Sequence, residues 1–216
     1  MAASERAILS SLTQQTDQWF ARACSALLSQ IPCSPGCSHC CIGPFPITLL
    51  DVRLLQEGLS RLPTDQKERI EQCAREQVSA MGAGYPKLTE SPYLDRWPDT
   101  EIDRLVHDFH RSPCPALGED GRCEVYKYRP LACRSMGIPT EEAGVISGAC
   151  DIQTFVPIVR LSALLRTEED ELAEREARAL DTCRLNMGAE GEEVLLPYGF
   201  LPAEKPEGLP EEPSQT

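Results

Sequence analysis

The sequence predicts a mainly α-helical protein, a small helical domain interrupted by two irregular, cysteine-rich loop segments. Three observations lead to this fold class. Long stretches carry apolar residues at helical spacing. The alternation of apolar and polar residues that predicts β-strands is weak throughout the sequence. Two segments rich in cysteine, proline and glycine break the helical pattern.

The helical pattern is clearest in the first half of the chain. Residues 4–29 predict an amphipathic helix without an internal Pro or Gly, with apolar positions at Ile8, Leu12, Trp19, Phe20, Ala23 and Leu27. A second helix follows in "ITLLDVRLLQEGLSRL", where Thr48 is the expected cap, Asp51 the third helical residue and Pro63 the end. Thr64 is the expected cap of a third helix that runs to about Ser79.

The second half predicts fewer helices. Glycines and prolines make residues 81–98 irregular, and a short helix is expected from Thr100 to His110. The segment "IVRLSALLRTEEDELAEREARAL" predicts a long charged helix that ends at Cys183. We expect one cysteine-cluster domain over residues 1–202, with its motif core at 31–150, and a disordered, acidic, Pro-rich tail at 203–216.

Composition narrows the function classes. The 216 residues carry a net charge of −13 and no basic patch, so we expect no nucleic-acid surface. The start of the chain lacks the pattern of a signal peptide, and no apolar run approaches the roughly 20 residues of a membrane span. We therefore expect a cytoplasmic protein without membrane contact. The odd count of 11 cysteines then favours metal ligands or redox thiols over disulfides.

The first cysteine segment has the pattern Cys33-x3-Cys37-x2-Cys40-Cys41. Thiolates are soft ligands that favour zinc or iron–sulfur clusters, and short spacers let a turn bring two sulfurs to one metal. Side chains of adjacent residues point to opposite faces of an extended chain. Cys40 and Cys41 would then ligate different atoms of a cluster or two centres, or Cys41 would be a buried thiol without a metal.

The second cysteine segment carries Cys114, Cys123 and Cys133, with Cys150 beyond them. Its spacings of x8, x9 and x16 lack the short pairs of a zinc ribbon, which favours a less regular site, iron–sulfur clusters included. "ALGEDGR" predicts a turn, within a small hairpin, between the first two of these cysteines. We expect both segments to converge on a metal or cluster site that holds one centre or a close pair.

Other residues receive supporting or structural roles. Tyr126, Arg129 and Arg134 cluster around Cys133, where positive charge and hydrogen-bond donors would stabilise bound thiolates from just outside the ligand shell. The remaining cysteines each lie in a predicted helix, and we interpret them as small apolar core residues: Cys24, Cys73 and Cys183.

The run CSPGCSHCC, then CPAL, then GRCEVYKYRPLACR and a later Cys, resembles the YkgJ-type cysteine-cluster family, named for a CxxCxxCC motif and associated with zinc or iron chelation. The likeness covers more than half of the chain, although the first spacer here is three residues instead of two. The resemblance implies eight ligand candidates, which are Cys33, Cys37, Cys40, Cys41, Cys114, Cys123, Cys133 and Cys150. It implies no settled reaction. A related cysteine region occurs in flagellin lysine methylases, so a methyl-transfer reaction is suggested by analogy alone.

Two enzyme classes compete with this interpretation. Cys33, Cys37 and Cys40 also have the spacing of radical S-adenosylmethionine enzymes, but a helix precedes the motif, and neither a Gly-Gly-Glu segment nor alternating strands and helices follow. A nucleophilic cysteine would need a base, and the histidines available are His39, His107 and His110. The last two are three residues apart on one helical face, where an exposed pair is the simpler interpretation.

The sequence therefore predicts a metal-binding protein that holds an iron–sulfur cluster, a [4Fe–4S] cluster in the first place, or zinc. Electron transfer or metal handling with a protein or redox partner would be its use. The alternative is a structural zinc module that serves protein interaction, and we predict no particular reaction.

Overall fold

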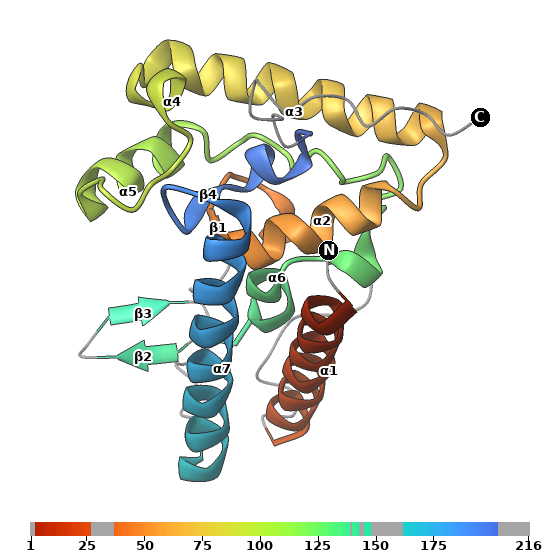
Figure 1. The fold of residues 1–216 in the computed structure, drawn as a ribbon, viewed down its shortest axis with the longest axis vertical. Helices are drawn as coiled ribbons and strands as arrows, with labels where there is room; N and C mark the ends of the chain where they lie inside the picture. Colours follow the sequence, from red (N-terminus) through yellow and green to blue (C-terminus); the bar gives the residue numbers. More distant parts are fainter. Residues whose placement is uncertain (1–2, 27–36, 139, 143–144, 148–161, 203–216) are drawn as a thin grey trace.

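We describe residues 3–26, 37–138, 140–142, 145–147 and 162–202 of a computed structural model (Figure 1). Within these ranges the fold is mainly α, as the sequence predicted. The elements, in chain order, are α1 (Ala3–Ala26), η1 (His39–Cys41), β1 (Pro46–Thr48), α2 (Leu49–Leu59), α3 (Thr64–Gly84), α4 (Lys87–Glu90), α5 (Asp99–Asp108), η2 (Tyr126–Tyr128), α6 (Leu131–Ser135), β2 (Thr140–Glu142), β3 (Val145–Ser147), α7 (Ala163–Met187), β4 (Glu193–Leu195) and η4 (Leu196–Phe200), where η denotes a 3-10 helix.

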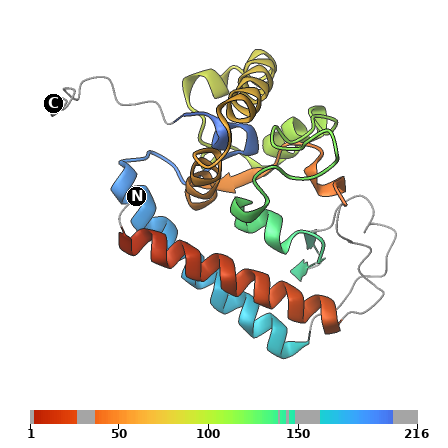
Figure 2. The ribbon, with the colours of Figure 1, turned by 90° about the vertical axis from the view of Figure 1, so that its right-hand side faces the viewer.

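The helices α1 and α7, from opposite ends of the chain, lie side by side (Figures 1 and 2). Trp19 is 2% exposed and donates its indole N–H to the Leu165 carbonyl oxygen at 2.9 Å. Ser162 caps α7 by accepting from the Leu165 amide at 3.4 Å, and Gly188 ends it in the left-handed conformation with a φ of 61°. Of the apolar positions predicted for the first helix, Leu12, Trp19 and Ala23 are buried as expected. Ile8 is 48% exposed, and its neighbour Leu9 is buried instead. Leu27 lies outside the described residues.

The middle helices follow the expected pattern, with corrections at both ends of α3 and at α4. Thr48 caps α2 by accepting from the Asp51 amide at 3.4 Å, as predicted. Thr64, by contrast, is the first residue of α3 and makes no side-chain capping bond, because Pro63 occupies the cap position. α3 continues past Ser79 to Gly84, and α4 lies within the stretch predicted to be irregular.

Two short antiparallel sheets complete the described fold. β1 pairs with β4, with Ile47 opposite Val194, and so ties the end of the described chain to the start of α2. β2 pairs with β3, with Glu141 opposite Ile146. Since these sheets are two-stranded, the described residues contain no partial barrel of the radical S-adenosylmethionine type.

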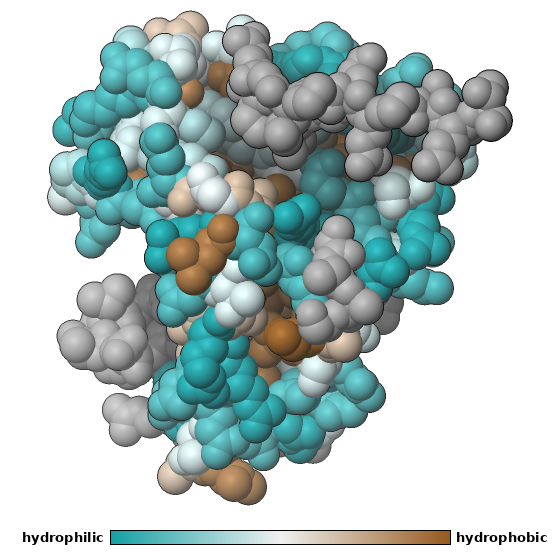
Figure 3. Space-filling model, in the orientation of Figure 1, coloured by the Kyte–Doolittle hydropathy of each residue, from teal (hydrophilic) through white to brown (hydrophobic). Residues whose placement is uncertain are grey.

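The largest buried cluster lies between α2, α3 and η4, where Leu55, Ile70 and Phe200 are at most 1% exposed. Cys114 and Cys123 pack against this cluster, so part of the second cysteine segment is anchored on the core. In the orientation of Figure 3 the surface is mostly hydrophilic, with hydrophobic side chains in small separate patches. No helix among the described residues is sufficiently long and apolar to span a membrane.

Candidate metal centre

The first cysteine segment is described from Cys37 onward, and Cys33 lies outside the described residues. Cys40 and Cys41 belong to η1, where the Cys41 amide donates to the Ser38 carbonyl oxygen at 2.9 Å. The chain is thus coiled here and not extended, so the rule that adjacent side chains point to opposite faces does not apply to Cys40 and Cys41. A hydrogen bond with the Cys41 side chain, followed by burial, raises the pKa of Cys40. The two adjacent thiols therefore lie in contact.

The second cysteine segment contains the predicted turn. The Gly118 amide donates to the Arg122 carbonyl oxygen at 2.8 Å, and Leu117 pairs with Cys123 in an antiparallel bridge. Gly121 has a φ of 76°, which a residue with a side chain rarely adopts, so the turn depends on glycine there. The hairpin places Cys114 and Cys123 on its two arms. Cys133 follows in α6, and Cys150 lies outside the described residues.

Backbone hydrogen bonds join the two cysteine segments directly. The Cys114 amide donates to the Cys41 carbonyl oxygen at 2.7 Å, and the Gly43 amide donates to the Ser112 carbonyl oxygen at 2.7 Å. Ile42 and Pro113 form an antiparallel bridge between these two bonds. A candidate ligand of the first segment is therefore held next to a candidate ligand of the second.

The thiols of both segments influence one another. Burial raises the pKa of Cys133 well above its ordinary value, and Cys114, Asp51, Cys123 and Cys40 raise it further. Burial also raises the pKa of Cys114 to about 12, with smaller contributions from Cys123, Cys73 and Cys40. Without a cation these thiols are protonated at neutral pH. These effects show that the thiols of the two segments share one region of the fold, where a positive ion that replaces the protons would offset the cost of burying thiolates.

Backbone donors near the sulfurs fit a bound thiolate. A hydrogen bond from the Ala116 backbone opposes the effect of burial on the pKa of Cys114. A bond from the Val125 backbone does the same for Cys123, where the charge of Arg129 also lowers the pKa. In both cases the donor lies two residues after the cysteine. Such bonds to sulfur offset thiolate charge in zinc and iron–sulfur sites.

Among the described residues, no three His, Cys, Asp or Glu side chains are arranged as a ready metal-binding group. Two of the eight ligand candidates, Cys33 and Cys150, lie outside that part of the chain. The assignment of all eight as ligands, and the convergence of the two segments on one centre, stay predictions.

The arginines near Cys133 have carboxylate and carbonyl partners. Arg129 donates to Asp17 Oδ1 at 2.9 Å, and Arg134 donates to Asp17 Oδ2 at 2.6 Å. The guanidinium of Arg129 also lies over the ring of Tyr126, 4.2 Å from its centroid. The charge of Arg129 lowers the pKa of Cys40 and of Cys123. The supporting role of Tyr126, Arg129 and Arg134 at a metal site stays a prediction. Arg134 is 4% exposed, and its guanidinium donates to a carboxylate oxygen and two carbonyl oxygens.

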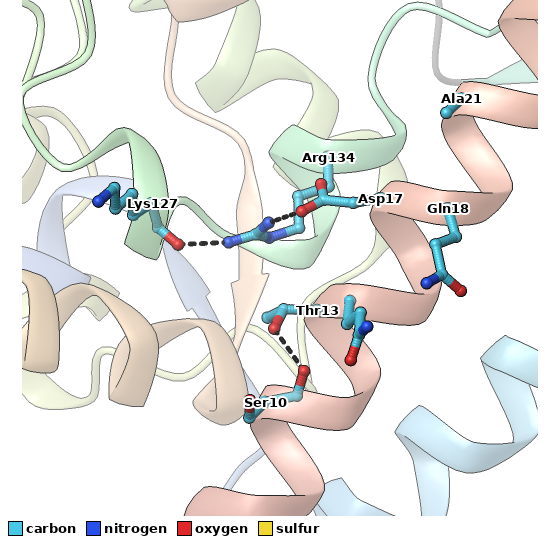
Figure 4. Close-up of a pocket in the computed structure, with 8 residues that line it drawn as sticks. Ser10, Thr13, Asp17, Gln18, Ala21, Lys127 and Arg134 are labelled. Carbon is cyan, nitrogen blue, oxygen red and sulfur yellow. Dashed lines mark hydrogen bonds and ion pairs between the residues drawn. The ribbon is translucent and has the colours of Figure 1, made fainter.

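An open polar pocket of about 500 Å³ lies beside this ion pair, between α1 and η2 (Figure 4). Its walls carry Thr13, Asp17 and Gln18 from α1 and Lys127 and Arg134 from the second cysteine segment. None of the cysteines that the structure describes lines this pocket.

The three remaining cysteines lie in helices, as predicted. Cys183 in α7 is 1% exposed and packs in the core, whereas Cys24 in α1 and Cys73 in α3 are half-buried. Cys73 accepts from Gln77 Nε2 at 3.5 Å, and the same amide donates to the Pro113 carbonyl oxygen at 2.8 Å. Cys73 therefore flanks the second cysteine segment. The sequence around Cys73 does not predict that this residue lies beside the second cysteine segment.

The histidines lie on the surface of the described structure. His107 and His110 are exposed and stacked, with ring centroids 5.4 Å apart, and His39 is exposed in η1. The backbone of His110 lies against Gly43. Sequence reasoning missed two acidic residues near the cysteines, Asp17 and the buried Asp51. The sequence pattern marks Asp51 as no more than a helix-start residue, and Asp17 belongs to no motif.

One protein-family model matches the region of the chain that contains the candidate thiols. The family model CxxCxxCC, "Putative zinc- or iron-chelating domain", matches residues 32–151, which is more than half of the chain. No curated protein and no solved structure matches. The matched range contains all eight ligand candidates together with Tyr126, Arg129 and Arg134. On the extent of this match, the chain belongs to the CxxCxxCC family of zinc- or iron-chelating domains.

Proposed function

We propose that this protein holds an iron–sulfur cluster or a zinc ion through its clustered cysteines, and that it serves electron transfer or metal handling. The observation that carries the proposal is the neighbourhood of Cys40, Cys114, Cys123 and Cys133, which come from two segments joined by the Cys114–Cys41 backbone hydrogen bond. When bound, the metal would supply a one-electron couple if it is an iron–sulfur cluster, or a structural crosslink if it is zinc.

The residues of this chain would do the rest. On binding a metal, the half-buried thiols would release their protons to water, and the backbone donors after Cys114 and Cys123 would stabilise the resulting thiolates. Arg129 adds positive charge beside Cys40 and Cys123. Contact between Cys40 and Cys41 lets both sulfurs approach one centre, and this favours a cluster that uses more than four thiols or a close pair of metals.

The nature of the metal separates this proposal from a purely structural zinc module. The experiment is anaerobic purification of the full chain, followed by metal analysis and a visible absorption spectrum. A brown protein with iron and acid-labile sulfide supports the iron–sulfur form. A colourless protein with zinc that unfolds when the metal is chelated supports the structural module. Protein without stoichiometric iron or zinc, before and after anaerobic reconstitution, contradicts both.

The ligands are tested by single Ser substitutions with metal counted per chain. We expect loss of metal for Cys33→Ser, Cys37→Ser, Cys40→Ser, Cys114→Ser, Cys123→Ser and Cys133→Ser, because each removes a metal bond that contributes to folding. Cys41 and Cys150 are the next candidates and are expected to behave as ligands.

The matched control for this series is Cys183→Ser. The Cys183 thiol is 1% exposed in the core, so Ser there is expected to cost stability without loss of metal. Cys24→Ser and Cys73→Ser are also expected to keep the metal. Full loading in Cys133→Ser, or metal loss in Cys183→Ser, would reject the ligand assignment.

A further inference from the structure

Asp17 in α1 accepts hydrogen bonds from two arginines of the second cysteine segment. Its Oδ1 accepts from Arg129 Nη2 at 2.9 Å, and its Oδ2 accepts from Arg134 Nη1 at 2.6 Å. Both oxygens of the Asp17 carboxylate therefore accept hydrogen bonds from the second cysteine segment. Asp17 lies outside residues 32–151, the range that matches the family.

Arg134 also binds the backbone of the segment that precedes Cys133. Its Nε donates to the Arg129 carbonyl oxygen at 3.2 Å, and its Nη2 donates to the Lys127 carbonyl oxygen at 2.6 Å. The side chain is 4% exposed, and Figure 4 shows it between Asp17 and Lys127. One guanidinium thus connects η2, the start of α6 and α1.

Removing the carboxylate would leave a buried cation without its counter-charge. A buried charge that loses its partner is strongly destabilising locally, and charge-assisted hydrogen bonds are the stronger kind. Arg134 would have to move toward water, and the backbone next to Cys133 would move with it. Arg129 would lose the carboxylate that fixes its position beside Cys40 and Cys123.

We propose that Asp17 is a positioning residue of the metal centre. It holds Arg134 against the Cys133 backbone and holds the Arg129 charge beside the Cys40 and Cys123 thiols. Retention of the metal then depends on the docking of α1, an element that contributes no candidate ligand to the centre. This inference rests on the proposed function.

The test compares Asp17→Asn and Asp17→Glu with the parent chain, after anaerobic reconstitution with the metal or cluster that purification of the parent reveals. Metal transfer to a chelator is followed well below the melting transition of each variant, together with the absorption spectrum of the centre, with Co²⁺ as the probe if the metal is zinc. We expect an unchanged stoichiometry in fresh Asp17→Asn protein, release about 10- to 100-fold faster, and an altered spectrum. Asp17→Glu, which keeps the carboxylate, should restore much of the retention.

Glu168→Gln is the matched control. Glu168 in α7 accepts from Arg22 of α1 at 2.7 Å, so this change also removes an ion pair of α1, but not one with the cysteine segment. It should release the metal at the parent's rate. Release from Asp17→Asn at the parent's rate, or equal acceleration in Glu168→Gln, would overturn the inference and leave the proposed function standing. A parent chain without bound metal would instead reject the proposed function, and the role of Asp17 with it.

Discussion

At the scale of single residues, Asp51 is the most unusual group near the cysteines. It is 1% exposed and accepts from the Leu131 amide at 2.6 Å, two residues before Cys133. Burial, followed by the charge of Glu176, raises its pKa to about 7, against the partial opposition of the Leu131 and Thr48 backbone bonds. Burial therefore keeps this carboxyl, which joins α2 to α6, protonated up to about pH 7.

Asp51 makes the stability of the metal-free protein depend on pH. The folded chain holds the proton up to about pH 7, whereas the unfolded chain releases it near its ordinary value of 3.8. Stability should therefore be greatest below that value and fall as the pH rises to about 7. Asp51→Asn should remove most of this fall, on the order of 1–4 kcal/mol. The free energy of unfolding in urea, measured for both proteins at several pH values between 5 and 8, tests this prediction.

The exposed residue Asp181 of α7 supplies the comparison, because Asp181→Asn should keep the slope of the parent. An Asp51→Asn variant whose stability falls with pH as steeply as that of the parent would show that the buried carboxyl does not cause the slope.

At the scale of elements, a close approach of α2 to η2 positions the chain between Cys123 and Cys133. A Cβ atom on Gly58 would lie 2.8 Å from the Cβ of Tyr128. A contact this short requires one of the two backbones to shift. Gly58 therefore allows the second cysteine segment to lie directly on the helix that carries Asp51.

Gly58→Ala should destabilise the protein by about 1–3 kcal/mol, as overpacking of a tight contact does. The same change at Gly84, in the last turn of α3, meets its nearest atom at 4.0 Å and should be neutral or stabilising by roughly 0.5–1 kcal/mol. Chemical denaturation of both variants makes the comparison. Equal effects at the two sites would show that the approach of α2 to η2 is not tight.

At the scale of the whole molecule, α1 and α7 form one flank. The described part of the second cysteine segment contacts that flank through α6 and contacts α2 of the core through η2. Trp19 of α1 and Leu165 of α7 join the flank, and Asp17 joins it to the cysteine segment. The residues before the family match are therefore part of the structure that supports the candidate centre.

Removal of residues 204–216 should leave the metal content and melting temperature almost unchanged. This Pro- and Glu-rich tail lies outside the described residues, and its composition offers little apolar surface to bury. Metal analysis and thermal melts of the truncated chain test the expectation, with removal of residues 196–216 as the comparison. That longer deletion takes away the buried Phe200 and should destabilise the fold. A large drop in melting temperature from the shorter deletion would show that the tail docks.

The sequence by itself determined the helical class, the capped start of α2 at Thr48, the turn between Cys114 and Cys123, and the family. These features depend on local periodicity, capping and short motifs, which neighbouring residues encode. It misplaced the start and the end of α3, because Pro63 took the cap position and packing extended the helix beyond Ser79.

Tertiary structure decided which distant residues meet. The contact of Cys40 with Cys41 followed from a 3-10 turn that no spacing encodes, and Cys73 came to flank Pro113 through the packing of α3. Asp17 reached Arg134, 117 positions away in the chain, because α1 docks on the second cysteine segment. Burial also raised the pKa of Asp51, whose place in the sequence marked no more than a helix start. Charge pairing and burial depend on the whole fold, and a local pattern cannot contain them.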